Sequence, residues 1–258
     1  MLSLAGARRF SMEITVCDTP EELAHCAAED GAARIREALE ERDRAVIALA
    51  AGSSQIGMLK NLVAAQEIDW GKVIAFPLDE YVGLSSRHPA SFSRYLLERF
   101  VERLPSELRA FYHVDGTEED PVKEAVRVSR LLQKETLDVS FIGIGENGHI
   151  AFNDPPADFD TEVPYLVVDL DQRCREQQIH EGWFEKLDEV PEEAISMSVQ
   201  QIMSSKHLIC TVPEARKAEA VQRALEGKVN AQVPASILQK HEECRFYLDK
   251  ESSALLKG

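Results

Sequence analysis

The sequence has few of the residues that mark specialised protein classes. It contains only 5 cysteines in 258 residues, an odd number without a Cys-x-x-Cys pair. This composition argues against a disulfide framework and suits a reducing compartment. The 7 histidines show no metal-ligand spacing, and no apolar run approaches the roughly 18 residues that a membrane span requires. We therefore expect a cytoplasmic protein with no metal and no membrane partner.

Basic residues are also scarce. The chain has 29 Lys and Arg against 45 Asp and Glu, a net charge of −16. Nucleic-acid binding, which depends on a basic surface, is not expected. At long range this charge repels a phosphate ester as well, so an anionic substrate needs backbone dipoles and one or two well-placed cations. We expect a small-molecule substrate.

The N-terminal segment does not have the order of a secretory signal, because Arg8 and Arg9 follow its apolar residues instead of preceding them. We interpret residues 1–11 as a disordered extension, with Met12 as an alternative start. No repeat, low-complexity tract or linker divides the rest, and 44% apolar residues suffice for a large core. The chain, residues 1–258, is predicted to form a single domain.

Strand and helix patterns alternate along the chain. Thr19 and Pro20 provide a capping box and a first-turn proline for a helix over 20–42. The other predicted helices cover residues 56–63, 91–104, 121–135, 213–226 and 234–240, and the strands 46–50, 73–78, 139–144, 194–199, 207–212 and 245–249. This order predicts an α/β fold with a mostly parallel, Rossmann-like sheet and helices on both faces. Residues 155–164 form a long loop or lid.

The stretch from Phe141 to Pro155 is the most informative part of the chain. An apolar strand ends in a glycine loop that presents His149 between Asn147 and Asp154. A strand end is where open α/β sheets bind ligands, and these residue types suit proton transfer. The alternative is a tight turn with a structural histidine. Although Gly143 to Gly148 matches G-x-G-x-x-G, the prolines at 155 and 156 oppose a following helix, so we predict no nucleotide and no other cofactor.

A second candidate site is the acid pair Asp79-Glu80, which follows the predicted strand at 73–78. Desolvation raises the pKa of a carboxyl group in a closed site, so it can act as a base near neutral pH. Neighbouring residues of an extended chain face opposite ways, so only one of the two is expected to enter the site. The alternative is a solvated acid pair.

Two segments are candidates for binding a phosphate. Gly52, Ser53 and Ser54 offer backbone amides and hydroxyls at a helix start, where the dipole favours anions, although a serine here can simply be an N-cap. Arg216 and Lys217 supply cations at the start of a later helix, or they are ordinary surface residues.

Two motifs carry a resemblance to a known family. Asp79 to Leu84 followed by His88-Pro89, together with Gly148 to Pro155, resembles the glucosamine-6-phosphate deaminase (isomerase) family. The similarity extends weakly from about residue 14 to 256. The superfamily also contains 6-phosphogluconolactonases, which share the glycine-loop histidine but usually continue differently. The chain is similar to a divergent member of the deaminase family.

The resemblance implies cofactor-free conversion of glucosamine 6-phosphate and water to fructose 6-phosphate and ammonia. His149 would open the sugar ring, with Asn147 and Asp154 orienting it. Asp79 would move a proton from C2 to C1, and water would then release ammonia. A lactone hydrolase acting on a sugar phosphate and a non-catalytic sugar-phosphate sensor remain the alternatives.

Several positions depart from the family pattern. Asn147 stands where Asp is usual, and Asp154 where Glu is usual, so direct contact of Asp154 with His149 would require the loop to shift. Lys217 matches a phosphate-binding lysine, and the motif assigns Gly148 to substrate binding. Gln178 replaces an expected arginine, which weakens phosphate binding unless Arg175 or Arg216 substitutes.

Regulation and assembly are less defined by the resemblance. The stretch 158–165 is acidic where some hexameric members carry a basic allosteric site. We therefore predict no activation by N-acetylglucosamine 6-phosphate. A homo-oligomer and the identity of the amino sugar are left open.

Overall fold

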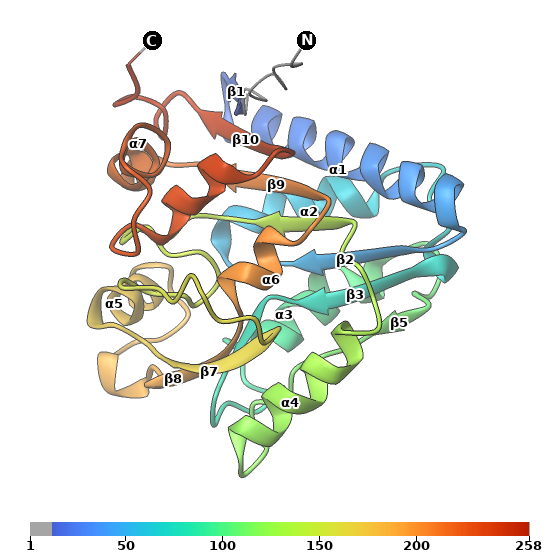
Figure 1. Ribbon diagram of the computed structural model, residues 1–258, viewed down its shortest axis with the longest axis horizontal. Coiled ribbons are helices and arrows are strands. Elements are labelled where there is room, and N and C mark those ends of the chain that lie inside the picture. Colours follow the sequence, from blue (N-terminus) through green and yellow to red (C-terminus); the bar gives the residue numbers. More distant parts are fainter. Residues whose placement is uncertain (1–11, 258) are drawn as a thin grey trace, which may run out of the picture.

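The computed structural model describes residues 12–257, so the extension expected at 1–11 lies outside the described part. Seven parallel strands form the central sheet (Figure 1). In spatial order they are β1 (Glu13–Cys17), β10 (Cys244–Asp249), β9 (His207–Val212), β6 (Val139–Ile142), β2 (Ala45–Leu49), β3 (Val73–Pro77) and β5 (Ala110–Phe111). The predicted α/β class with a mostly parallel sheet is confirmed.

Helices cover both faces of this sheet. Helices α1 (Pro20–Arg42), α2 (Ile56–Val63) and α3 (Phe92–Arg99) supply one core, and α4 (Pro121–Leu132), α6 (Val199–Met203) and α7 (Ala218–Glu226) supply the other. Strand β2 shows why both are needed: Val46 and Ala48 join one core, whereas Ile47 and Leu49 join the other. A strand with apolar residues on both sides requires a cover on each side.

A second, three-stranded antiparallel sheet was not predicted. It consists of β4 (Asp79–Tyr81), β8 (Glu193–Met197) and β7 (Tyr165–Asp169) in that order. Leu78 joins the two sheets, since its N–H donates to Leu49 and its carbonyl accepts from Met197. Asp79 therefore begins β4 instead of ending β3. Sequence alternation does not reveal such a switch, because the chain stays extended through it.

Other differences concern short or irregular elements. The edge strands β1 and β5 and the helix α5 (Gln172–His180) were missed, since short and polar segments carry weak periodicity. Three predicted helices contain 3₁₀ turns, at Val101–Arg103, Ala215–Lys217 and Pro234–Lys240. Residues 155–164 contain no helix or strand, as predicted.

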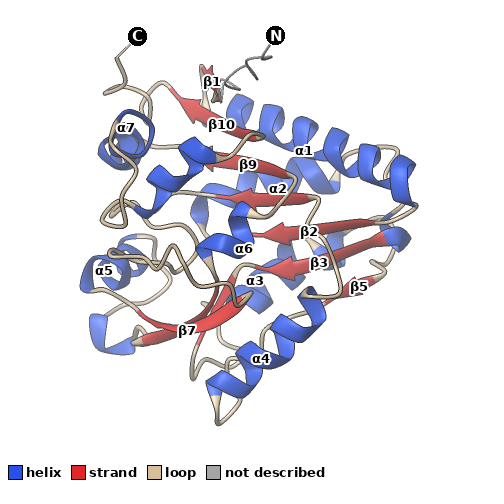
Figure 2. Cartoon of the chain, in the orientation of Figure 1, coloured by secondary structure: helices blue, strands red, loops and turns tan. Residues whose placement is uncertain are grey.

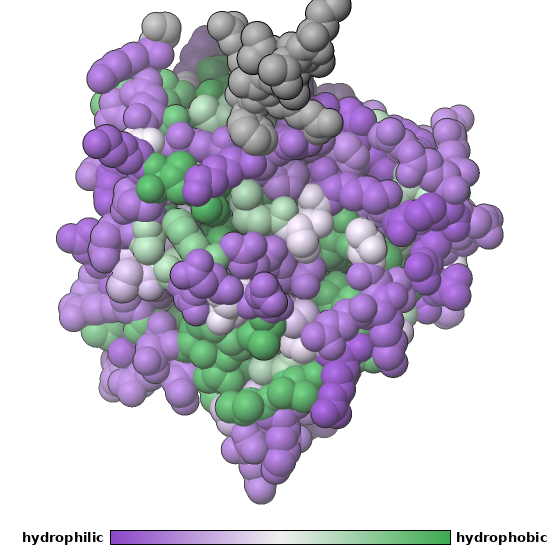
Figure 3. Space-filling model, viewed as in Figure 1, coloured by the Kyte–Doolittle hydropathy of each residue, from purple (hydrophilic) through white to green (hydrophobic). Residues whose placement is uncertain are grey.

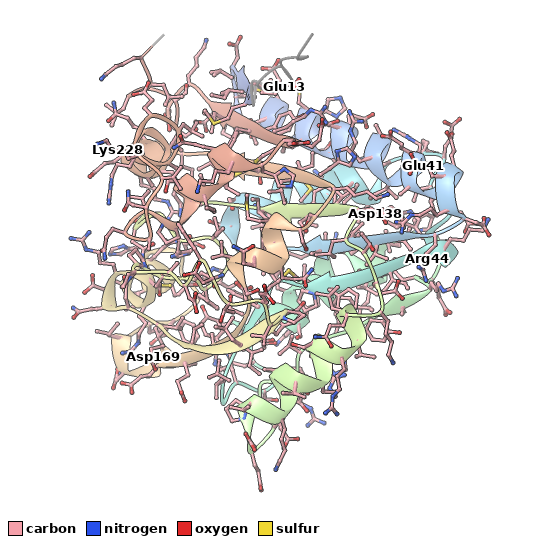
Figure 4. All side chains as sticks on the ribbon, in the orientation of Figure 1. Glu13, Glu41, Arg44, Asp138, Asp169 and Lys228 are labelled. Atoms are coloured by element: carbon pink, nitrogen blue, oxygen red, sulfur yellow. The ribbon has the colours of Figure 1, made fainter. Side chains whose placement is uncertain are left out.

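The two ends of the parallel strands differ in character. At the amino ends, the carboxylate of Asp138 is 1% exposed, accepts a hydrogen bond from the Val46 N–H at 2.8 Å and contacts Arg42. Figure 4 shows Asp138 at this end with Glu41 and Arg44 nearby. At the carboxyl ends, the strand arrowheads point toward α5 and α7 (Figure 2). The candidate site lies at this second end.

The surface of the described residues is mixed. Figure 3 shows an apolar area where α4 and β7 lie, and Val122, Val126 and Val163 are exposed there. None of the helices between residues 12 and 257 combines the length and the apolar character needed to cross a bilayer.

Candidate active site

A cavity opens at the carboxyl ends of the parallel strands and brings most of the predicted site residues together. Its lining consists of Ala50 to Ser54, Asp79, Phe92, Gly143, Ile144, Gly145, His149, Ala151, Phe152, Gln177, Gln178, Glu181 and Lys217. Loops after β2, β3, β6 and β9 supply most of these residues, as expected for an α/β sheet.

Asp79 is the acid of the pair that faces the cavity. Its side chain is almost completely buried, yet its carboxylate accepts no hydrogen bond from any residue between 12 and 257. Burial raises its pKa well above the ordinary value, and the neighbouring charge of Glu80 adds to this. Such a group can take up a proton from a substrate bound in the cavity.

Glu80 is turned away and has a structural role. Its carboxylate accepts hydrogen bonds from the Ser91 hydroxyl at 2.7 Å and from the backbone N–H of Ser93 at 2.8 Å, at the start of α3. The expectation that only one of the two acids enters the site is confirmed. The carboxylate of Glu80 caps the N-terminus of α3 by accepting hydrogen bonds from backbone N–H groups that have no partner within the helix.

His149 lies in a turn that only glycines allow. The Gly145 N–H donates to the His149 carbonyl at 3.0 Å, and Gly148 has φ of +93°. A Cβ on Gly145 would come within 2.3 Å of the imidazole ring. Gly148 does not line the cavity, and its N–H donates to the Gly145 carbonyl at 2.9 Å. We therefore find no contact through which its amide reaches a substrate.

Asp154 contacts His149 directly, so the loop shift expected from its shorter side chain is not needed. Asp154 Oδ1 lies 3.0 Å from His149 Nδ1, close enough for an ion pair, although the ring N–H is not aligned for a hydrogen bond. Asp154 Oδ2 accepts from the Asp171 N–H at 2.9 Å. Burial alone would raise the pKa of Asp154, but His149, Asn147 and Asp171 lower it overall. The acid stays ionised behind the imidazole.

Asn147 acts on the histidine through the backbone and through Asp154. Its Oδ1 accepts from the His149 N–H at 3.0 Å, and its Nδ2 donates to Asp154 at 2.9 Å and to Asp171 at 3.0 Å. The amide thus donates to two carboxylates, both of which an acid in its place would repel. Together, Asp79, His149, Asp154 and Asn147 form what we call the proton-transfer cluster.

The serine loop lies on the other part of the cavity lining. Gly52 has φ of +107°, and its carbonyl accepts from the Tyr95 hydroxyl at 2.8 Å. Ser53 begins a 3₁₀ turn, Ser53–Gln55, without a side-chain cap, so the serine is not an N-cap there. Arg216 Nη2 donates to Ser53 Oγ at 3.2 Å. The backbone amides of this loop are therefore candidates for donating hydrogen bonds to a bound anion.

Lys217 is buried beside this loop, as the phosphate assignment requires. Desolvation lowers its pKa, and no hydrogen bond of its ammonium group is found within the described chain. Its charge partner is Glu181, whose Oε1 lies 4.0 Å from Lys217 Nζ. We call Gly52 to Ser54, Arg216, Lys217 and Glu181 the anion cluster.

Of the two arginines expected as substitutes, only one belongs to this cluster. Arg175 donates to the carbonyls of Leu187 and Val190, both at 2.8 Å, and does not line the cavity. Gln178 does line it, and its Oε1 accepts from the Tyr81 hydroxyl at 2.8 Å. Arg216 therefore remains as the substitute that contacts the serine loop.

Glu181 is the residue that sequence reasoning missed. It lies three positions after Gln178, so the two share a face once α5 is recognised as a helix. Neither this helix nor the pairing of Glu181 with the cations was predicted. Polar residues in a segment without apolar periodicity gave no signal of their own.

The comparison with known proteins decides the family. The family described as glucosamine-6-phosphate isomerases and 6-phosphogluconolactonases matches residues 18–246. The chain belongs to this family. The resemblance drawn from the two motifs is thereby confirmed.

Curated members of the family span nearly the whole chain. Glucosamine-6-phosphate deaminase 1 of Bacillus subtilis (strain 168) is 32% identical over 248 residues, covering 95% of this chain and 99% of that protein. A glucosamine-6-phosphate deaminase of Exiguobacterium sibiricum is 36% identical over 210 residues, covering 81% of each.

Solved structures agree with this assignment. A glucosamine-6-phosphate deaminase described as monomeric matches with a TM-score of 0.87 and 32% identity, over 95% of this chain and 100% of that one. The 6-phosphogluconolactonase of Trypanosoma brucei matches with a TM-score of 0.79 at 19% identity, over 96% and 100%. The second likeness concerns the fold alone.

Proposed function

We propose that the protein converts glucosamine 6-phosphate and water to fructose 6-phosphate and ammonia. The observation that carries this proposal is Asp79, a buried carboxylate of raised pKa that lines the same cavity as His149. A proton held next to a developing imine is removed by such a base. The deaminases at 32% and 36% identity support the same reaction.

Ring opening is assigned to His149. The imidazole takes the proton of the anomeric hydroxyl and returns one to the ring oxygen, which gives the open aldehyde. Asp154, 3.0 Å from the ring nitrogen, balances the charge that the imidazole gains in between. Asn147 holds Asp154 in that position.

Isomerisation and deamination follow at Asp79. Its carboxylate removes the C2 proton of the open sugar and delivers it to C1. The C1 oxygen gains a proton as the amino group loses one, so that C1 becomes a hydroxymethyl carbon and C2 an imine. Water adds to this imine, and the C–N bond breaks to release ammonia and the ketose. Lactone hydrolysis, by contrast, removes no proton from C2. A lactonase would therefore have no use for Asp79 as a base.

The test measures ammonia and fructose 6-phosphate released from glucosamine 6-phosphate by the purified protein. We expect both in equal amounts and neither with Asp79→Asn. Release of acid from a phosphogluconolactone at comparable rates, without ammonia from the amino sugar, would support the lactonase instead. Binding of the sugar phosphate without any product would support a sensor.

Other expectations accompany this proposal. A single domain, a location in the cytoplasm, independence of cofactors and metals, and absence of activation by N-acetylglucosamine 6-phosphate stay predictions. The oligomeric state also stays open. Light scattering after size-exclusion chromatography tests it, with a relative described as monomeric as the reference case.

A further inference from the structure

The anion cluster already contains an anion of its own. Glu181 Oε2 accepts from the Ser53 N–H at 3.4 Å, and Glu181 Oε1 lies 3.5 Å from Arg216 Nη2 and 4.0 Å from Lys217 Nζ. These are the donors that would hold a phosphate in this part of the cavity. The Glu181 side chain is only 5% exposed.

Glu181 is held in place from its own segment. Its carboxylate accepts from Gln177 Nε2 at 2.7 Å and from Trp183 Nε1 at 3.2 Å, both shorter than its contacts with the serine loop and the cations. Burial alone would raise its pKa, but Lys217, Gln177 and Trp183 lower it overall. The Glu181 carboxylate is therefore a negative charge that is held in a fixed position beside the serine loop and the two cations.

The remaining positive charge in the cluster is small. Arg216 is also bound to Glu214 at 2.6 Å and to Glu146 at 3.0 Å, so most of its donors are occupied. Lys217 is the cation that makes no hydrogen bond within residues 12–257. Two cations thus face three carboxylates before any phosphate arrives.

We propose that Glu181 is a specificity-determining residue that competes with the substrate phosphate for Ser53, Arg216 and Lys217. The inference rests on the proposed function, because it concerns the distal end of the same substrate. A phosphate binds only by displacing the carboxylate or by tolerating a like charge close by, and both weaken its affinity. The site therefore discriminates poorly between an amino sugar phosphate and the unphosphorylated amino sugar.

The first test is calorimetric binding of inorganic phosphate to the wild-type chain and to Glu181→Gln. The amide removes the charge and keeps one acceptor oxygen, for Gln177 or for Trp183, which bind different oxygens of Glu181. We expect phosphate affinity to rise at least about tenfold, given the strength of charge interactions at this range. Glu185→Gln, an exposed change of equal charge on the same segment, is the matched control and should leave the affinity within about twofold.

The second test compares kcat/KM for glucosamine 6-phosphate with kcat/KM for glucosamine. Glu181→Gln should raise this ratio about tenfold or more, and adding Lys217→Met should remove the gain. Unchanged phosphate affinity and an unchanged ratio in a folded Glu181→Gln protein would overturn the proposal. If that variant melts too early to assay, Glu181→Asp, with a shorter reach, should give a smaller gain in the same direction, and an unchanged affinity there would count equally against it.

The two proposals fail in different ways. If no ammonia is released from either sugar, the proposed function fails, whereas phosphate binding still decides the role of Glu181. If ammonia is released but the variants bind phosphate alike, only the role of Glu181 fails.

Discussion

The proton-transfer cluster and the anion cluster treat their carboxylates in opposite ways. Behind His149, Asp154 is tied by three partners, and Asp79 is left without a hydrogen bond inside the described chain, facing the cavity. In the anion cluster, the acid Glu181 stands among the donors that a ligand would use. The proton-transfer cluster thus has a base available for a reaction, whereas the donors of the anion cluster are already bound by a carboxylate of the protein.

This difference separates the chemistry from the choice of substrate. A reaction needs a base that is free and an acid whose charge is balanced, and the proton-transfer cluster has both. Affinity for a distal phosphate needs hydrogen-bond donors that are not already paired. The anion cluster has few of these, because its cations contact carboxylates of the protein. The chain can therefore keep the family's chemistry while the group that it recognises at the far end of the sugar changes.

The largest expected effect comes from the two neighbouring acids. Asp79→Asn should lower kcat/KM about 10²–10⁴-fold, because the variant cannot accept the C2 proton. Glu80→Gln should instead lower stability by about 1–3 kcal/mol, through its hydrogen bonds to α3, with a much smaller effect on turnover. Ammonia assays and thermal melts of both variants separate the roles, and equal losses of turnover would contradict them.

The second-largest loss of activity is expected from a substitution that disturbs the packing of His149 against the glycine loop. In Gly145→Ala the added Cβ lies 2.3 Å from the imidazole, so the ring must move away from its position beside Asp154. We expect a loss in kcat of about 10²-fold, typical of a displaced catalytic group. Gly71→Ala, whose Cβ meets only a flexible side chain, is the control and should retain wild-type kcat.

A smaller effect is expected in the anion cluster. Lys217→Met should raise KM for glucosamine 6-phosphate by less than about tenfold, because Glu181 already competes for the ammonium, and should leave kcat nearly unchanged, because Lys217 faces the distal phosphate and not the reacting carbons. Lys228→Met makes the same charge change at an exposed position beyond α7 (Figure 4) and should leave both constants unaltered. A fall in kcat with constant KM would instead place Lys217 in the reaction.

The smallest effect concerns stability and pH. Because burial raises the pKa of Asp79, the folded state holds its proton more tightly than the unfolded state, and stability is lost as pH rises through the folded pKa. Asp79→Asn removes this loss. Its melting temperature should exceed that of the wild type at pH 7, by about 2–4 °C for each kcal/mol, and the difference should vanish below the ordinary pKa of 3.8. A constant difference across pH would speak against a raised pKa.

Parts of the site were predictable because they depend on the local chain. The glycines around His149 and the entry of only one of Asp79 and Glu80 into the site follow from local pattern, whereas Asp79 as the base and Lys217 as a phosphate ligand were assigned through the family resemblance. Two contacts were predicted incorrectly or missed. The reach of Asp154 depends on where Asp171, at the start of α5, holds it, and the position of Glu181 depends on the end of that helix.

The sequence by itself determined the α/β class, the order of most strands and helices, the family resemblance and the residues suited to proton transfer. These follow from periodicity, turn residues and local motifs, which act over a few positions along the chain. Only the tertiary structure decided that Leu78 links two sheets, that Asp154 touches His149 and that Glu181 meets Ser53 and Lys217. Such contacts join segments far apart in sequence, and their partners are set by how the layers pack.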